Sequence, residues 1–192
     1  MKTRVLICAM IALLWLQNIY AQNTYTNPVI RKYLADPSVI KANDGWFYVY
    51  ATESAGLAIP IYKSQNLVDW TFVGSAFTKA GRPTFVKNGW LWAPDINYIN
   101  GKYVLYYSMS VWGGEWECGI GVATSSSPSG PFKDHGKLFT SSEIGVRNSI
   151  DPCFFQDKDG KNYLFWGSFH GIYGAELSAD GLRLKKETKF QI

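Results

Sequence analysis

The sequence predicts an all-β protein made of consecutive blades of a β-propeller. Helical periodicity is nearly absent after the first 21 residues, where short aromatic and β-branched runs alternate with turns of Gly, Asn, Asp and Ser. Aromatic residues make up 16% of the chain, which is typical of a strand-rich fold. In addition, one strand–turn–strand unit recurs three times along the chain. With 47% hydrophobic and 18% charged residues, the chain is predicted to bury a core and not to be disordered.

Each copy of the unit starts with an acidic residue beside proline, continues with a short apolar strand, turns at glycine and ends in an aromatic strand. The copies begin at Asp36-Pro37, Pro94-Asp95 and Asp151-Pro152, and their turn glycines, at positions 45, 101 and 160, are 56 and 59 residues apart. Asn or Asp precedes each of these glycines. Such pairs favour tight hairpins because both residues tolerate positive φ.

Two further strands are expected in every unit. They are predicted at 59–63 and 70–73, at 119–123 with a weak piece near Phe132, and at 172–177 and 182–184. Four antiparallel strands at a period of about 50 to 60 residues are typical of propeller blades. A sandwich of hairpins is the alternative, but it would not repeat the acidic residue beside proline and the Asn-Gly or Asp-Gly turn at a constant period. We therefore expect blades at about 36–85, 92–140 and 150–192.

The first 21 residues have the features of an export signal. Lys2 and Arg4 provide a positive start, residues 5–16 form an apolar run, and Ile19-Tyr20-Ala21 offers a cleavage site before Gln22. The apolar run is short for a membrane span and polar residues follow it, although a retained anchor is the alternative. We predict cleavage after Ala21 and a secreted or periplasmic protein.

Charge and cysteine content exclude several classes of partner. Removal of the signal takes away two basic residues, so the net charge becomes 17 − 15 = +2, which does not indicate a nucleic-acid or membrane partner. Only Cys118 and Cys153 then remain; their spacing indicates neither a disulfide nor a metal site, so we expect two buried free thiols. His135 and His170 are the only histidines, too few for a His-rich metal cluster.

Two carboxylates occupy matching places in the repeat. In a propeller the first strand of each blade lies nearest the axis, so residues at its start gather at one mouth of the channel. Asp36 and Asp151 each begin such a strand and should lie close together, although 115 residues separate them. Glycoside hydrolysis needs two carboxylates in a cleft, and aromatic rings pack on the faces of sugars. A turn or cap explains either Asp-Pro alone, whereas the matched pair favours a catalytic function.

Four motifs, taken in order, resemble those of glycoside hydrolase family 43. They are Ala35-Asp36-Pro37-Ser38, the run from Ser64 to Trp70, Trp92-Ala93-Pro94-Asp95, and Asn148-Ser149-Ile150-Asp151-Pro152. A later stretch, Trp166-Gly167-Ser168-Phe169 followed by Gly171-Ile172, resembles the arabinanase side of the family. The similarity spans roughly residues 27–192. It implies a five-bladed β-propeller, truncated here to about its first three blades, whose parent hydrolyses arabinan with inversion.

The resemblance also implies roles for single residues. Asp36 matches the general base, which takes a proton from the attacking water, and Asp151 matches the carboxylate that orients the general acid and raises its pKa. Inversion implies a base and an acid roughly 6.5–9.5 Å apart. The residues matching sugar-binding positions, each of which could instead serve only the fold, are Trp92, Trp112, Asn148 and Ser168. The implied partner is a polysaccharide or oligosaccharide substrate, and the oligomeric state is left open.

Three other features bear on the resemblance. Asp95 is expected to hold its blade together from the start of a strand and not to catalyse. The general acid of the family is a Glu on the fourth blade, and Glu176 and Glu187 are poor substitutes, so we expect the fragment itself to be inactive and marginally stable. A later His that helps arabinanases hold a metal ion is also missing. We therefore expect no metal or cofactor in this fragment and leave open a structural calcium ion in a full-length parent.

Three other functions stay open at this point. One is an exo-acting β-xylosidase or α-L-arabinofuranosidase of the same family, which only the shape of the cleft could distinguish. Another is a non-catalytic carbohydrate-binding propeller, although a lectin would not need both Asp36 and Asp151. The third is an acyl-transferring or phosphorolytic enzyme on a related propeller, against which the motifs around Asp36 and Trp92 argue.

Overall fold

The structure, a computed structural model, describes residues 24–192 and is almost entirely β. Its elements are β1 (Ser38–Lys41), β2 (Phe47–Tyr50), β3 (Pro60–Ser64), β4 (Thr71–Ser75), β5 (Trp90–Ile99), β6 (Lys102–Ser110), β7 (Gly119–Ser125), β8 (Lys133–Thr140), α2 (Ser141–Ile144), β9 (Cys153–Gln156), β10 (Asn162–Ser168), β11 (Gly171–Glu176) and β12 (Phe190–Gln191). No helix within the described residues is long and apolar enough to cross a membrane. The predicted signal segment, residues 1–21, lies outside them.

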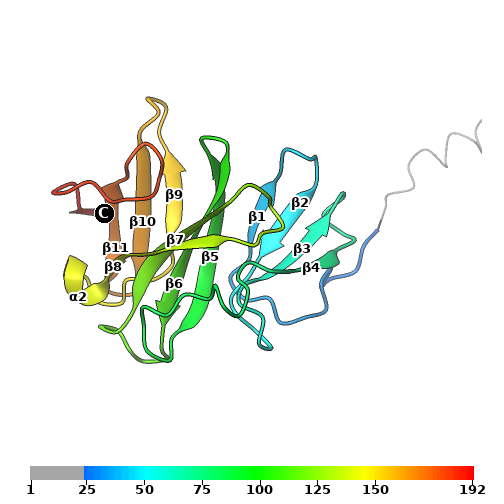
Figure 1. The fold of residues 1–192 in the computed structure, drawn as a ribbon, viewed down its shortest axis with the longest axis horizontal. Helices are drawn as coiled ribbons and strands as arrows, with labels where there is room; N and C mark the ends of the chain where they lie inside the picture. The colour runs from blue at the N-terminus through cyan, green and yellow to red at the C-terminus, as the bar shows by residue number, and fades with distance from the viewer. Residues whose placement is uncertain (1–23) are drawn as a thin grey trace, which may run out of the picture.

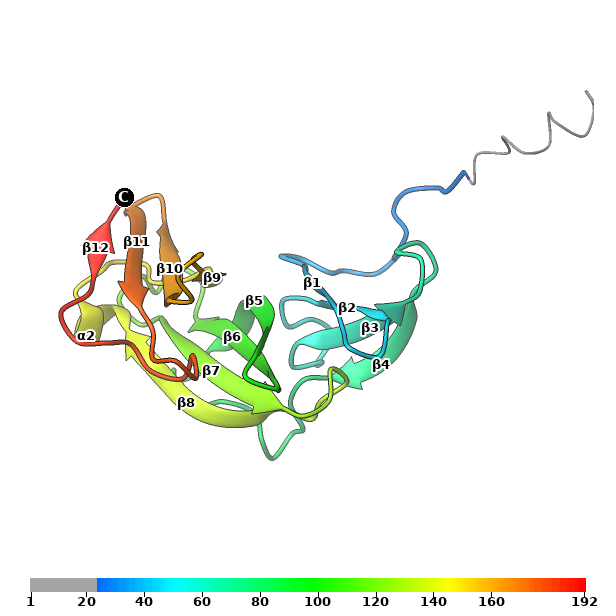
Figure 2. The same ribbon diagram turned by 90° about the horizontal axis from the view of Figure 1, so that it is seen from above.

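The strands form three four-stranded antiparallel sheets, β1–β4, β5–β8 and β9–β12, each in sequence order. The sheets follow one another along the molecule (Figure 1). Seen from above, they form an arc with β1, β5 and β9 on its inner side and β4, β8 and β12 on its outer side (Figure 2). This is the arrangement of neighbouring propeller blades, in which the first strand of each blade faces the axis.

The turn between β5 and β6 shows why the glycine signals predict hairpins. Ile99 pairs with Lys102, so the loop contains only Asn100 and Gly101. Both residues have positive φ, 48° and 81°, as a two-residue type I′ turn requires. Asn and Gly are the residues that adopt this conformation at least cost, and the predicted turn is confirmed.

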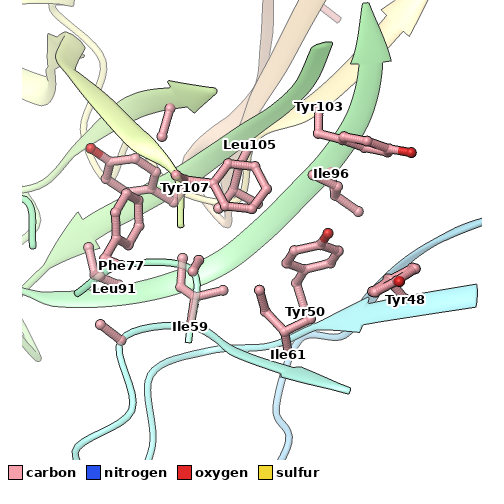
Figure 3. Close-up of a cluster of buried hydrophobic side chains, with 14 of the residues drawn as sticks. Tyr48, Tyr50, Ile59, Ile61, Phe77, Leu91, Ile96, Tyr103, Leu105 and Tyr107 are labelled. Atoms are coloured by element: carbon pink, nitrogen blue, oxygen red, sulfur yellow. The ribbon is translucent and has the colours of Figure 1, made fainter. Parts of the chain in front are cut away.

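Two hydrophobic clusters lie between neighbouring sheets. The first joins the sheets β1–β4 and β5–β8, with Tyr50 and Ile61 from one side and Leu105 and Tyr107 from the other (Figure 3). The second joins the sheets β5–β8 and β9–β12 and includes Trp166, which is 1% exposed. Blade-on-blade packing therefore provides the core, because one blade alone could not bury both of its faces.

The strand β6 is buried on both faces. Tyr103, Leu105 and Tyr107 point into the first cluster, whereas Val104 and Tyr106 point into the second. Side chains alternate between the faces of a strand, so a strand between two cores reads as a continuous apolar run instead of an alternating one. The second sheet thus links the two clusters.

Three elements differ from the prediction. The fourth strand of the third sheet is β12 and not residues 182–184, where Leu184 forms only an isolated bridge with Leu177 beside a tight turn. The strand β5 begins at Trp90, upstream of Pro94, and the ladder is irregular between Trp92 and Asp95 because proline has no N–H to donate. The short helix α2 was not predicted.

Local capping explains α2. The Thr140 hydroxyl accepts a hydrogen bond from Glu143 N, and the Glu143 carboxylate accepts one from Thr140 N. This capping box starts the helix, and Gly145 ends it with a φ of 67°. The turn leads the chain from β8 toward the segment that precedes β9.

Candidate active site

Three equivalent positions converge on the inner side of the arc. Asp36, Ala93 and Asp151 each precede a proline and each have positive φ, 51°, 40° and 58°. Two residues later, Ser38, Asp95 and Cys153 pair with Tyr50, Tyr106 and Phe165 in the second strand of their own sheet. The three positions are therefore structurally equivalent, and the acidic copies are in the first and third blades.

A depression of about 340 Å³ is lined by these three X-Pro segments, Asp36–Ser38, Ala93–Asp95 and Asp151–Cys153. We call it the carboxylate depression. It brings Asp36 and Asp151 together, as their places in the repeat predict. The intervening blade contributes Ala93 at the position equivalent to Asp36 and Asp151, and the acidic residue of its segment is Asp95, two positions later.

Two hydroxyl groups hold the acidic segments in place. Thr52 Oγ1 donates to Asp36 Oδ2 at 2.6 Å and accepts a hydrogen bond from Ala93 N at 2.9 Å. Ser108 Oγ accepts a hydrogen bond from Asp151 N at 2.8 Å. The sequence analysis missed both residues. Thr52 comes two residues after Tyr50, and Ser108 comes two residues after Tyr106. Because both hydroxyl residues occupy this same place in the repeat, their position is the signal that could have identified them.

The electrostatics of the depression act on Asp151. Desolvation raises the pKa of the Asp151 carboxyl above its ordinary value, and the negative charge of Asp36 raises it further. This shift is the response expected of two carboxylates that share a concave site at the meeting point of several strands.

The Asp151→Asn substitution is expected to raise the melting temperature at pH 7. The pKa of Asp151 is higher in the folded protein than in the unfolded chain, so its ionisation destabilises the fold. The free energy of unfolding therefore falls as pH rises from the pKa of the unfolded chain through that of the folded protein. Above this range the neutral Asn avoids the cost of a charged Asp151. Below the ordinary pKa of about 3.9 both states are protonated and the difference should vanish.

Calorimetric melting of both proteins at pH 7 and pH 3 measures this effect. Asp159→Asn in the exposed β9–β10 turn is the matched control, since it removes a carboxylate that neither lines the depression nor shares a hydrogen-bond partner with Asp151. An equal shift at the two pH values would contradict an electrostatic origin.

An aromatic groove adjoins the carboxylate depression. This hollow of about 350 Å³ is lined by, among others, Trp92, Trp112, Glu115, Asn148, Ile150 and Phe169. The rings of Trp92 and Trp112 meet edge to face, with centroids 6.2 Å apart. Trp92 precedes Ala93 and Ile150 precedes Asp151, so consecutive residues line the groove and the depression. The two hollows therefore lie beside each other along the same chain segments.

Polar groups meet the aromatic rings in the groove. Asn148 is buried and donates from Nδ2 to Ser168 Oγ at 2.6 Å. The structure thus brings together all four residues predicted to contact a sugar, because Trp92, Trp112 and Asn148 line the groove and Ser168 is bonded to Asn148. Sequence reasoning missed Glu115 and Phe169, although Phe169 stands directly after Ser168 in the arabinanase-like motif.

Asp95 lies inside β5 and not at its start, so its predicted position was wrong. Its Oδ2 accepts hydrogen bonds from Phe154 N of β9 at 2.7 Å and from Asn97 Nδ2 at 2.8 Å. Burial raises the pKa of Asp95, while the hydrogen bonds from Phe154 and Asn97 lower it. Asp95 therefore joins the second blade to the third.

Other predicted groups lie elsewhere. Both cysteines are free, and Cys118 is buried, but Cys153 is exposed because it faces the mouth of the depression. The expectation that both thiols are buried was wrong for Cys153. Glu176 pairs with Lys185, and Glu187 lines a separate hollow beside Lys186, so neither glutamate reaches the depression. Residues 24–192 contain no group of three or more His, Cys, Asp or Glu arranged to hold a metal ion.

Comparison with known proteins gives the same architecture. The chain is 40% identical to the extracellular endo-alpha-(1->5)-L-arabinanase 1 of Bacillus subtilis (strain 168) over 145 residues, which are 71% of this chain and 43% of that protein. It is 35% identical to a probable arabinan endo-1,5-alpha-L-arabinosidase A of Aspergillus clavatus, covering 75% of this chain and 45% of the relative.

Solved structures agree. The native Bacillus subtilis arabinanase superposes with a TM-score of 0.72 at 33% identity, covering 84% of this chain and 57% of that one. A Cellvibrio cellulosa α-L-arabinanase complexed with arabinohexaose gives a TM-score of 0.70 at 30% identity, with 82% and 52% covered. The chain thus spans about half the length of the relatives it matches, and the predicted fold class, a β-propeller represented here by three blades, is confirmed. Residues 25–192 match the glycosyl hydrolases family 43, and the chain belongs to that family.

Proposed function

We propose that the complete protein containing this chain is an inverting glycoside hydrolase that cleaves arabinan. The observation that carries the proposal is the pair Asp36 and Asp151, held at equivalent positions of two blades in a depression that adjoins an aromatic groove. The names of the relatives, most of which describe arabinan-cleaving enzymes, support this substrate.

In the proposed mechanism Asp36 is the general base. A water molecule attacks the anomeric carbon from the face opposite the leaving sugar, and the Asp36 carboxylate takes its proton as the new C–O bond forms. Thr52 holds that carboxylate by donating to Oδ2, which leaves Oδ1 available to the water. The glycosidic C–O bond breaks, and its oxygen receives a proton from a general acid.

That acid is not among the residues that line the carboxylate depression. We assign it to a Glu outside residues 24–192, following the family resemblance. We assign to Asp151, whose pKa is raised by desolvation and by Asp36, the role of interacting with such an acid. Its negative charge would raise the pKa of the acid and keep it protonated for transfer.

The aromatic groove is proposed to bind the sugars beside the scissile bond. Trp112 offers an exposed ring face, Trp92 supports it from the side, and the Asn148 and Ser168 side chains supply hydrogen-bonding groups. An apolar surface with a few oriented polar groups is what sugar recognition requires.

Export is a further part of the proposal. Residues 1–21 carry the features of a signal, and two relatives are named as extracellular enzymes. N-terminal sequencing of the protein secreted by its own host should begin at Gln22, and a mature protein that retains Met1 would contradict export by this signal.

Product analysis tests the function. Debranched arabinan incubated with the complete protein should give short oligosaccharides, and proton NMR during the first minutes should show new reducing ends in the anomeric configuration opposite to that of the substrate. Release of arabinose alone would favour the exo-acting alternative, and hydrolysis of aryl β-xylosides without arabinan cleavage would favour a xylosidase. Retention of configuration would refute the assignment of Asp36 as a base for water.

A further inference from the structure

Two exposed aromatic side chains border the aromatic groove from different blades. Trp112, which follows β6, is 94% exposed, and Phe169, in the turn between β10 and β11, is 78% exposed. Large aromatic rings this exposed contribute little to the core, and both line the same hollow. A sugar chain lying in the groove can contact both rings only if the two loops that carry them keep a fixed spacing.

Glu115 connects these two loops. Its carboxylate pairs with Arg147 Nε and accepts a hydrogen bond from His170 Nε2 at 3.3 Å. His170 is the neighbour of Phe169, and their ring centroids lie 4.5 Å apart. The backbone carbonyl of Glu115 accepts a hydrogen bond from Asn148 N at 2.8 Å. One residue of the second blade is thus bonded to the segment that leads into the third blade and to the β10–β11 turn, both of which border the groove.

The Trp112 loop is tight enough to transmit the position of Glu115. Gly114 N donates to Val111 O at 2.9 Å, and Glu117 N donates to Gly114 O at 3.0 Å, so two turns overlap within seven residues. A Cβ at Gly114 would lie 2.4 Å from Val111 Cγ2, which shows how closely the loop packs on itself. A displacement of Glu115 therefore displaces Trp112.

The same contacts contribute little to stability. The side chains of Glu115, Arg147 and His170 are 24%, 51% and 29% exposed, and ion pairs between partly exposed side chains typically add little to the free energy of unfolding. Because these contacts lie at the junction of two blades, they instead determine how the two loops beside the groove are positioned.

We propose that Glu115 is a positioning residue that fixes the spacing between Trp112 and Phe169, and thereby the affinity of the groove for an arabinose-containing chain. The inference rests on the proposed function for the identity of the sugar. Two rings that contact one sugar chain bind it best at the spacing in which they are preorganised, so a change in that spacing weakens the enzyme–substrate complex. The effect should fall on substrate binding, because Glu115 does not line the carboxylate depression.

The test compares Glu115→Ala, Glu115→Gln and the unchanged complete protein. Glu115→Ala should raise KM for arabinohexaose about tenfold while kcat stays within about twofold, the pattern of lost uniform binding. Glu115→Gln keeps the shape and one acceptor oxygen but loses the charge-assisted bonds, so KM should rise about threefold. Glu176→Gln is the matched control, since Glu176 also forms an ion pair, in its case with Lys185, but borders neither hollow, and it should leave KM unchanged.

Calorimetric titration with arabinohexaose gives a second readout that does not need hydrolysis. Affinity should fall in the order unchanged, Glu115→Gln, Glu115→Ala, while the melting temperatures stay within a few degrees. An unchanged KM and affinity in both variants would overturn the inference, as would a fall in kcat at constant KM. If the alanine variant does not fold, the isosteric glutamine variant decides.

The two proposals can fail separately. A protein that binds arabinohexaose without cleaving it would refute the proposed hydrolase, and the affinity series would still decide the role of Glu115. A protein that hydrolyses arabinan with unaltered parameters in the Glu115 variants would refute the inference alone. A protein that neither binds arabinohexaose nor cleaves arabinan would refute both proposals.

Discussion

Replacing Asp36 with Asn in the complete protein should lower kcat on debranched arabinan by about 10²–10⁴-fold, the contribution typical of one general base. This corresponds to a loss of about 2.7–5.4 kcal/mol of transition-state stabilisation. The amide cannot take a proton from the attacking water. It preserves the rest of the site, because Asn tolerates the positive φ of this position and its oxygen can still accept the Thr52 hydrogen bond.

The loss should be in the chemical step and not in binding. Arabinohexaose affinity of the Asp36→Asn protein, measured by calorimetry, should stay close to that of the unchanged enzyme. Asp159→Asn, in an exposed turn remote from both hollows, controls for the loss of one negative charge. Undiminished turnover by the Asp36 variant would remove this residue from the role of base.

Replacing Asp95 with Ala should destabilise the protein by about 2–4 kcal/mol. The carboxylate accepts hydrogen bonds from Phe154 N and Asn97 Nδ2, and bonds to a charged group contribute about 1.5–3 kcal/mol each. Alanine leaves the Phe154 N–H without this acceptor between two blades. For a chain of this size the melting temperature should fall by about 2–4 °C for each kcal/mol lost.

Asp95→Asn is the control that identifies the cause. It keeps an oxygen where Oδ2 accepts both hydrogen bonds, and it removes a charge that burial disfavours. Chemical denaturation should therefore place its unfolding free energy within about 1 kcal/mol of the unchanged protein. Equal destabilisation by Ala and Asn would mean that the charge, and not the hydrogen bonds, joins the two blades.

Much of the fold could be predicted from the sequence because short stretches of neighbouring residues specify the turns and strands of each repeat. Hairpins such as Asn100-Gly101 are specified by residues that accept positive φ, and aromatic runs mark the second strands wherever both faces are buried. The outer strands were harder to predict. The strand β12 is two residues long and depends on pairing with β11, so no pattern of its own identifies it. The helix α2 depends on one capping box and has no apolar stripe.

The part of the candidate site that could be predicted is the part whose position depends only on the order of strands in the propeller. Equivalent positions in successive blades converge on one mouth, which brings Asp36 and Asp151 together. The residues that support them were missed because their contacts cross between blades: Thr52 bonds Ala93 N, and Ser108 accepts from Asp151 N. Glu115 was missed for the same reason, since pairing with Arg147 and His170 appears only when the two loops meet in space.

The double-sided burial of β6 has a consequence for the order in which the chain is synthesised. When the second blade leaves the ribosome, Tyr103 and Leu105 can already pack on the first blade, whereas Val104 and Tyr106 have no neighbouring blade to pack on until β9–β11 follow. The nascent chain must therefore pass through a stage in which one apolar sheet face is open to water, as is common for intermediates of larger proteins. A chain that has emerged from the ribosome only as far as residue 140 would keep that face open and favour aggregation, whereas one that has emerged as far as residue 180 could cover it.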